Sequence, residues 1–459
     1  MKKRVLAITV SLLTIVCIVF MLLHKSNNDP NKVLPQGEGL AVQKEDVASV
    51  TIGVGFIAVV KETGELWICV TDDELLASGY NDKSVWKLDD NVASATHLVT
   101  ERHMESGTYD GPLLLGILYK DGTFWIWEVP VMQHQGGRPD FTQVSYTPKK
   151  IMEGVSSVTA GKYSFGVLKT NRTLWWISLK QDADKSLPYT EQINYRKGLS
   201  GVKAIGITNA ENMQTYILKE GGTLLGYGEN GGGQLGVGFK SGSAKRVYLD
   251  KITKITESVD AVITVGEQLD ICTHTMAIKE DKSLWLWGYD SYFDFSDTID
   301  FRTSYSPVKV MDDVATVALG GGHSLVIKND KSLWAWGYND YGQIGTGARN
   351  GEVANKPVHI MDSVIAISAC GGRSFALQED GTLWAFGANQ YGKLGTGDTI
   401  DRFEPTQIMD DVASIKTTSS CSVAVKKDGS VWLWGHPTQK NAVQTDENAY
   451  ISTPICILR

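Results

Sequence analysis

One stretch of sequence occurs twice almost unchanged, as KNDKSLWAWGYNDYGQIGTG (Lys328–Gly347) and as QEDGTLWAFGANQYGKLGTG (Gln378–Gly397). Weaker copies return along the chain at intervals of about fifty residues. The first tryptophan of the stretch marks its phase, which is occupied by Trp67, Trp125, Trp175, Leu225, Trp285, Trp334, Trp384 and Trp432. A repeat of this length predicts an array of supersecondary units that bury their apolar surfaces against one another.

Each unit is predicted to consist of short β-strands. Branched and small residues alternate on both sides of a two-residue turn, which is Asp-Gly at 121–122, 380–381 and 428–429. Asp-Gly favours a tight hairpin because both residues tolerate positive φ. The following stretch, rich in Gly and Asn, predicts a hydrogen-bonded loop. Four strands in about fifty residues form one blade of a β-propeller, and the paired tryptophans are expected in the core between blades.

The ends of the array predict a closed, all-β ring of about eight blades. A Pro-x-x-(Ile/Val)-Met phrase precedes most units, beginning at Pro148, Pro307, Pro357 and Pro405. The first unit, which starts at Val47, lacks it, whereas the chain ends in the similar Pro454–Leu458. We therefore expect the C-terminal strand to complete the sheet of the first unit, which leaves no open edge. Seven blades are the alternative, if the irregular second or fourth unit merges with a neighbour.

Taken together, these motifs resemble the regulator of chromosome condensation repeat family. The phrase D-G-x-L-W-x-W-G-x-N-x-x-G-Q-L-G-T-G, with G-G-x-H-S upstream, recurs in many units across residues 41–459. The resemblance implies a β-propeller, which mostly has seven blades in that family. Members include a nuclear guanine-nucleotide exchange factor and bacterial propellers that bind other proteins. Because the shared motif builds the framework, it implies the fold and leaves the activity open.

Residues 1–24 predict a signal anchor that crosses the membrane as one helix. The basic triplet Lys2–Arg4 precedes an uncharged run, Val5–Leu23, which is long enough to span a bilayer. The positive flank is expected in the cytoplasm, so the propeller should lie on the extracytoplasmic side. A cleaved signal, giving a secreted protein, and a lipoprotein attached at Cys17 are the alternatives.

The rest of the chain divides into a polar tether over residues 25–40 and the propeller over residues 41–459. The 459 residues are 42% hydrophobic and carry a net charge of −8. No basic cluster is present to neutralise phosphates, which argues against nucleic-acid binding. The cysteines lack metal-ligand spacing, so buried free thiols are expected, with a Cys370–Cys421 bridge as the alternative. We expect a monomer from a bacterium.

The sequence predicts no enzyme and no cofactor or metal site. His274 and His323 share one repeat phase, which holds Arg373 and Cys421 in the last two units. Each histidine is followed by Thr275 or Ser324, but neighbours on a strand point to opposite faces, so a framework role is expected. The turn aspartates form no calcium-loop pattern. The triple-Gly runs are not followed by Lys-Ser/Thr, as a phosphate loop requires.

Insertions in three units suggest a binding face. Val314 precedes the turn residue Asp330 by 16 positions, whereas the same interval is 29 from Val92 to Asp121, 19 from Val202 to Gly221 and 22 from Val259 to Asp281. Because all three insertions fall at one phase, they should emerge on one rim of the ring. The longest offers the partner-binding candidates Arg102, His103, Met104 and Tyr109. Tolerated surface drift is the alternative.

A second set of candidates is aromatic. Tyr292, Tyr341 and Tyr391 occupy one phase in consecutive units. Tyrosine suits both protein hot spots and stacking against sugars. These rings also suit a structural role beneath the Gly-rich loop.

The leading functional hypothesis is a membrane-tethered, extracytoplasmic propeller that acts as a non-enzymatic protein-interaction module with an unidentified protein partner. The first alternative is a cell-wall or glycan-binding propeller that uses the tyrosines. The second is guanine-nucleotide exchange on a GTPase, implied by the nuclear relatives, which the predicted anchor disfavours because a GTPase would be cytoplasmic.

Overall fold

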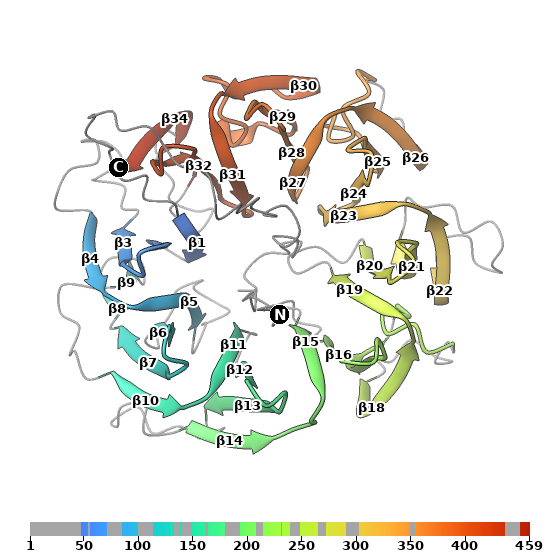
Figure 1. Ribbon diagram of the computed structural model, residues 1–459. Helices are drawn as coiled ribbons and strands as arrows, with labels where there is room; N and C mark the ends of the chain where they lie inside the picture. The colour runs from blue at the N-terminus through green and yellow to red at the C-terminus, as the bar shows by residue number, and fades with distance from the viewer. Residues whose placement is uncertain are drawn as a thin grey trace, which may run out of the picture.

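The computed structural model of the protein describes residues 47–53, 56–70, 85–99, 113–129, 131–132, 138–139, 148–160, 164–179, 193–207, 214–230, 232–238, 248–264, 272–290, 303–348, 354–436 and 450–459. These residues form eight four-stranded antiparallel sheets, each a blade of one ring (Figure 1). The alternative of seven blades is therefore wrong, because the second and the fourth units each form a sheet of their own.

The strands of the first four blades are β1 (Val47–Gly53), β2 (Phe56–Lys61), β3 (Leu66–Val70) and β4 (Val85–Asp89); β5 (Val92–Val99), β6 (Leu113–Tyr119), β7 (Phe124–Val129) and β10 (Lys149–Met152); β11 (Val155–Ala160), β12 (Ser164–Lys169), β13 (Leu174–Leu179) and β14 (Ile193–Lys197); β15 (Val202–Ile207), β16 (Gln214–Lys219), β17 (Leu224–Glu229) and β18 (Tyr248–Thr256). A short pair, β8 (Val131–Met132) and β9 (Arg138–Pro139), lies within the second unit.

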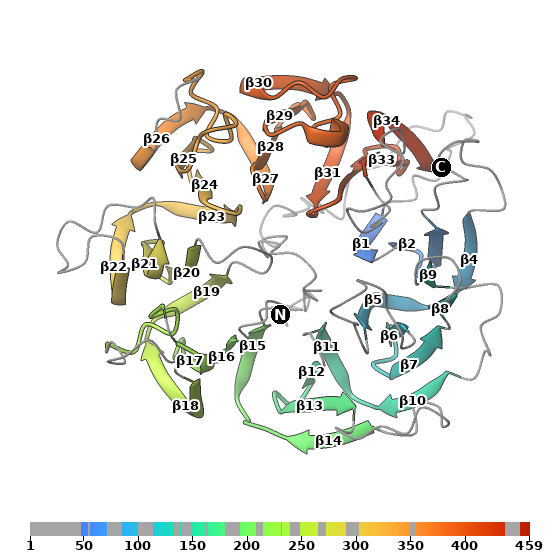
Figure 2. The ribbon, with the colours of Figure 1, turned by 180° about the vertical axis from the view of Figure 1, so that it is seen from behind.

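The strands of the last four blades are β19 (Val259–Thr264), β20 (Cys272–Lys279), β21 (Leu284–Asp290) and β22 (Thr303–Met311); β23 (Val314–Leu319), β24 (His323–Lys328), β25 (Leu333–Gly337) and β26 (Ala354–Met361); β27 (Val364–Cys370), β28 (Arg373–Gln378), β29 (Leu383–Gly387) and β30 (Arg402–Met409); β31 (Val412–Thr417), β32 (Cys421–Lys426), β33 (Val431–Gly435) and β34 (Ile451–Leu458). In every blade the first strand lies towards the centre of the ring and the fourth lies at the rim (Figures 1 and 2).

The predicted strand exchange between the two ends of the chain is wrong. The C-terminal strand β34 pairs with β33 of the last blade, and the first blade takes all four strands from its own unit. The reason lies in the phase of the Pro-x-x-Ile-Met phrase. Pro357 belongs to β26, the rim strand of the sixth blade, and does not lead the seventh. The first unit therefore lacks nothing before Val47, and the last unit needs Pro454–Leu458 as its own rim strand.

Side-chain packing between the first and last blades closes the ring. Ile52, Ile57 and Val59 of the first blade share one apolar core with residues of the eighth, among them Val423 and Ile457. Lys416 Nζ also donates a hydrogen bond to Val50 O across this junction, at 2.7 Å. The last blade lies beside the first in both views (Figures 1 and 2). Burial of apolar surface at this seam replaces the expected strand exchange.

The predicted hairpin turns are confirmed. Gly122, Gly381 and Gly429 have φ values of 81°, 96° and 85°, and Lys331 takes the same conformation at 67° where the sequence has Asp-Lys. The turn aspartates accept hydrogen bonds from the residue two positions later, such as Thr123 N to Asp121 Oδ1 at 2.8 Å. These hydrogen bonds lower the pKa of the turn carboxyls. A turn role therefore accounts for the aspartate pattern.

The tryptophans lie between blades, as expected. The second tryptophan of the phrase is fully buried, at positions 287, 336 and 434. The first is half-buried, as in Trp334, which packs at the edge of the same cores. No helix within the described residues is long and apolar enough to cross a membrane, and the expected anchor, residues 1–24, lies outside them.

Candidate functional site

The antiparallel order of strands gives the ring two different faces. The loops between the first and second strands, and between the third and fourth strands, leave from one side, which we call the loop face. The tight turns between the second and third strands lie on the other side, which we call the hairpin face. Gly372, in a loop of the first kind, lies next to Tyr341, in a loop of the second kind, with 3.2 Å between a Cβ built on Gly372 and Tyr341 Cδ2.

The strand ends that flank all three insertions lie on the loop face, so the insertions share one side of the ring, as the sequence predicted. They fall between β5 and β6, between β15 and β16, and between β19 and β20, which are the first and second strands of their blades. The candidates Arg102, His103, Met104 and Tyr109, however, lie outside the described residues, and so does Tyr292. Their role in binding stays a prediction.

The two described tyrosines differ in exposure. Tyr341 is 45% exposed and makes an edge contact with Tyr338, with 6.2 Å between the ring centroids. Tyr391 is half-buried and lies 5.3 Å from His436 and 6.4 Å from Tyr450, measured between ring centroids. Its φ of 61° lies in the left-handed region, which a tyrosine seldom adopts. Of these two described rings, therefore, one is exposed and the other is held in place by its surroundings.

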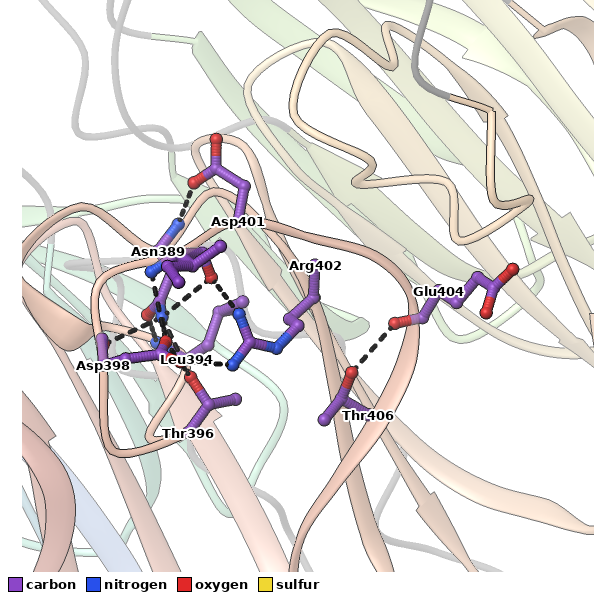
Figure 3. A network of polar contacts seen from close by, with 9 residues as sticks. Asn389, Leu394, Thr396, Asp398, Asp401, Arg402, Glu404 and Thr406 are labelled. Carbon is purple, nitrogen blue, oxygen red and sulfur yellow. Dashed lines mark hydrogen bonds and ion pairs between the residues drawn. The ribbon is translucent and has the colours of Figure 1, made fainter.

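A hydrogen-bond network holds the loop that presents Tyr391 (Figure 3). Asn389 Oδ1 accepts from Leu394 N at 2.8 Å, and Asn389 Nδ2 donates to Thr396 Oγ1, at 2.9 Å, and to Asp398 Oδ1, at 3.0 Å. The backbone N–H of Asn389 donates to Asp401 Oδ1 at 2.7 Å. A buried asparagine thus replaces the backbone pairing that an irregular loop lacks.

An ion pair completes the same network. Arg402 Nη2 lies 2.7 Å from Asp398 Oδ2, and Arg402 Nη1 donates to Ile400 O at 2.5 Å (Figure 3). The arginine and its neighbours lower the pKa of the Asp398 carboxyl. Although its backbone is held in this way, the Ile400 side chain is 66% exposed. An apolar side chain on a rigid loop suits contact with a partner, because little conformational freedom remains to be lost.

In the fourth, sixth and seventh blades, one main-chain carbonyl of the Gly-rich loop accepts a hydrogen bond from a side chain of the next blade. Gln343 O accepts from Ser374 Oγ at 2.6 Å, and Lys393 O accepts from Trp434 Nε1 at 3.0 Å. At the junction of the fourth and fifth blades, Gln234 O accepts from Trp287 Nε1 at 2.8 Å. Because the acceptor is the main chain, the bond does not depend on which side chain occupies this position.

His323, in the repeat position that the sequence singled out, also has a framework role. His323 Nε2 lies 2.8 Å from Ser374 Oγ of the next blade, and adjacent Ser324 is not its partner. Ser374 uses its only proton in the bond to Gln343 O, so His323 Nε2 must be the donor in the bond between the two side chains. A nitrogen that already carries a proton cannot accept one from the serine, and burial lowers the pKa of His323 to about 3. This pair therefore fastens two blades and is not an activated nucleophile.

The same phase in the seventh blade holds a buried cation. Arg373 is 6% exposed, and its Nη2 donates to Thr418 O at 2.7 Å and to Ser419 O at 3.1 Å. Lys393, in the phase of Gln343, donates from Nζ to the same Ser419 O at 3.0 Å. Burial and the nearby Arg373 charge lower the pKa of Lys393 to about 8. We call Arg373 and Lys393 the cation pair.

Sequence reasoning did not select the cation pair. The signal was a departure from the repeat, since Arg373 replaces the histidine of the preceding units and Lys393 replaces a glutamine. Cys370 and Cys421, which flank the pair, are both reduced, so the alternative of a bridge between them does not hold. Burial raises the pKa of Cys421 to about 11, which keeps it protonated. Within the described ranges, no group of three or more metal-ligating side chains gathers.

Sequence comparison finds the repeat in the same blades. A family model described as Regulator of chromosome condensation (RCC1) repeat matches residues 330–377 and 380–425, and a second RCC1-repeat model matches residues 314–343. No curated protein matches the chain.

Comparison with solved structures finds similar chains. The structure of Kap60 bound to yeast RCC1 (Prp20) has a TM-score of 0.50 at 18% identity, and the match covers 70% of this chain and 80% of that one. Human WBSCR16 has a TM-score of 0.49 at 16% identity, covering 72% and 89%. Identities this low indicate the fold alone. Residues 314–425 therefore consist of repeats of the regulator of chromosome condensation (RCC1) family.

Proposed function

We propose that this propeller is a protein-interaction module that binds its partner on the loop face of the sixth, seventh and eighth blades. The observation that carries the proposal is the pair of exposed side chains Tyr341 and Ile400 on neighbouring loops. The loop of Ile400 is held by the Asn389 network, and that of Tyr341 by Ile344 N donating to Asn339 Oδ1 at 3.0 Å. Exposed aromatic and aliphatic anchors on rigid loops are typical of binding hot spots.

Two further observations support a binding role. The His323–Ser374 pair has its protons committed to the framework, so the one His-Ser contact among the described residues supports no acyl-transfer chemistry. Yeast RCC1 (Prp20), which shares the fold, was solved with Kap60 bound, so a protein that contains this fold binds another protein. That likeness supports the class of function and does not identify a partner.

The proposal includes the membrane tether. The basic triplet Lys2–Arg4 before the apolar run Val5–Leu23 supports an anchor with the propeller on the extracytoplasmic side. Protease added to intact cells should then degrade the propeller. Protection in intact cells, followed by cleavage after lysis, would contradict this orientation and would favour a cytoplasmic partner such as a GTPase.

The binding face can be tested with the full-length protein in detergent micelles, used to capture surface proteins from the source cells. The double variant Tyr341→Ser/Ile400→Ser should lose the captured protein. Ile365→Ser is the matched control, because Ile365 is 40% exposed but lies at the start of β27, on the hairpin face. Equal capture by the double variant would place the interaction elsewhere. Retention on purified cell wall, with no protein captured, would support the glycan alternative.

A further inference from the structure

We propose that the junction of the seventh and eighth blades is an anion-binding site, in which the cation pair receives a carboxylate from an acidic segment of the partner protein. This inference rests on the proposed function, because it assigns the charge of the partner at the same face.

The first argument is that both cations point at the same acceptor. Arg373, from β28, and Lys393, from the loop before β30, both donate to the carbonyl of Ser419 in the eighth blade, at 3.1 and 3.0 Å. A backbone carbonyl offers only a partial negative charge. Two full positive charges therefore meet around one weak acceptor. Burial lowers the pKa of Lys393, and the repulsion between the two charges lowers it further.

The second argument is the missing counter-charge. The ion pairs among the described residues, such as Arg402–Asp398 in the same loop, include neither member of the cation pair. Burial of a cation without an opposite charge opposes folding, because the surrounding protein solvates the charge less well than water. An anion supplied by a partner would offset this cost, so the bound state would be favoured.

The third argument is spare donor capacity. A guanidinium carries five N–H donors, and the described residues accept hydrogen bonds only from Nη2 of Arg373. Its Nε is buried without a partner. The Lys393 ammonium has three donors, of which one bonds to Ser419 O. Carboxylates accept charge-assisted hydrogen bonds from such donors more strongly than carbonyls do.

The fourth argument comes from the equivalent junction of the sixth and seventh blades. There the two positions hold His323, which is neutral, and Gln343, whose Oε1 accepts from Tyr341 N at 3.0 Å. The fastening bonds at both junctions use the carbonyl of residue 343 or 393, so the fold does not require a cation at either position. The charges at the seventh and eighth blades are therefore additional to the framework.

The surroundings of Lys393 indicate the kind of anion. Lys393 is partly exposed, and its Nζ lies 5.4 Å from the centroid of the Tyr391 ring, which itself contacts His436 and Tyr450. Aromatic rings around a cation are typical of protein hot spots. A nucleic acid would need a row of cations, whereas this site offers two on a chain with a net charge of −8. A single acidic side chain fits both facts.

The test measures binding of a fluorescein-labelled tetraglutamate peptide to the full-length protein in micelles by fluorescence anisotropy. The variant Arg373→His/Lys393→Gln copies the residues of the neighbouring junction, so it should fold and should bind the peptide at least tenfold more weakly. Lys393→Arg, which keeps the charge, should retain binding. The control Lys331→Gln/Lys427→Gln removes the same net charge from the hairpin face and should leave the affinity unchanged.

The outcomes are distinct. Equal affinity for the wild type and the junction variant, or an equal loss in the hairpin-face control, would overturn the proposal. Displacement of the peptide by millimolar inorganic phosphate but not by glutamate would overturn the assignment of a carboxylate. Because the probe is a peptide, failure here with continued capture of a partner through Tyr341 and Ile400 would leave the proposed function standing.

Discussion

The junction between the sixth and seventh blades and the junction between the seventh and eighth blades share one backbone plan but differ in charge. The first is filled by His323 and Gln343, which are neutral, and the second by Arg373 and Lys393, which are cations. In both, a loop carbonyl accepts hydrogen bonds from the next blade. The repeat therefore sets the fastening bonds, while the side chains around them are free to acquire a binding role.

The largest loss of stability is expected from removing the buried aromatic ring at each junction, which is Trp434 at one and Phe386 at the other. Trp434→Ala should destabilise the protein by about 4–6 kcal/mol, from the cavity and the lost indole bond to Lys393 O. The equivalent Phe386→Ala should cost about 3–5 kcal/mol, since Phe386 is equally buried and has no N–H. Chemical denaturation of both variants measures the difference. Identical losses would show that the indole hydrogen bond contributes nothing.

Lowering the pH should destabilise the protein through His323, at the junction of the sixth and seventh blades. The pKa of His323 is about 3 in the folded protein, against 6.5 for an unperturbed histidine. The unfolded chain therefore binds more protons between these values, so stability falls as the pH is lowered from 6.5 towards 3. His323→Gln should remove about 2–4 kcal/mol of this loss. Thermal unfolding across that range tests it, and parallel curves for variant and wild type would contradict the buried neutral histidine.

Raising the pH should stabilise the protein through Lys393, at the junction of the seventh and eighth blades. The pKa of Lys393 is about 8 in the folded protein, against 10.5 for an unperturbed lysine, so the unfolded chain binds more protons in this window. Stability should rise with pH from 8 to 10.5, by about 1–3 kcal/mol, a range reduced because Lys393 is partly exposed. The difference between wild type and Lys393→Gln isolates this group from other titrating residues. A flat difference curve would mean that Lys393 is fully hydrated.

The loops of the two blades should respond differently to loss of their asparagine. The Asn389 side chain bonds to Leu394 N, Thr396, Asp398 and Ile400 O, whereas that of Asn339 bonds to Ile344 N and, at 3.4 Å, to Thr346 Oγ1. We expect Asn389→Ala to cost about 2 kcal/mol and Asn339→Ala about 1 kcal/mol. Unfolding of the two variants, with hydrogen exchange at Leu394 and Ile344, measures this. A larger loss for Asn339→Ala would reverse the inferred order of loop rigidity.

The smallest effect is expected at the hairpin turns. Lys331 in the sixth blade and Gly381 in the seventh occupy the same turn position with φ values of 67° and 96°. Lys331→Gly should stabilise the protein by about 0.5 kcal/mol, because glycine relieves the left-handed conformation, while the exposed Lys331–Glu379 ion pair offsets part of the gain. Differential scanning calorimetry can resolve such a change. A decrease in melting temperature would show that the ion pair outweighs the strain.

Comparison of these blades also shows why the sequence predicted the ring but not its closure. Strand number, turn position and buried tryptophans follow from local alternation and from Asp-Gly pairs, which act within about twenty residues. The C-terminal strand was assigned to the wrong blade because the phrase at Pro357 reads equally well as the end of one unit and as the start of the next. Only the pairing of β26 with β25 resolves that phase.

The candidate site was less accessible to sequence reasoning. The common phase of Tyr341 and Tyr391 was evident from the repeat, but their difference in exposure depends on Tyr450, which is 59 positions further along than Tyr391. The sequence shows that His323 and Ser324 point to opposite faces of a strand, but it does not show that the fold pairs His323 with Ser374 of the next blade. Contacts between blades join residues one repeat apart, and a repeat pattern read unit by unit does not show them.

The sequence by itself determined the repeated strands, the hairpin turns, a ring of seven or eight blades and the resemblance to the RCC1 repeat family, because each follows from local spacing and residue type. The tertiary structure fixed the number of blades at eight. The tertiary structure alone decided which strand completes the last blade and which side chains meet at each junction. It also brought Arg373 and Lys393 together around Ser419 O. That contact arises because burying the apolar faces of neighbouring blades fixes their backbones at close range, so distant polar groups must find partners across the junction.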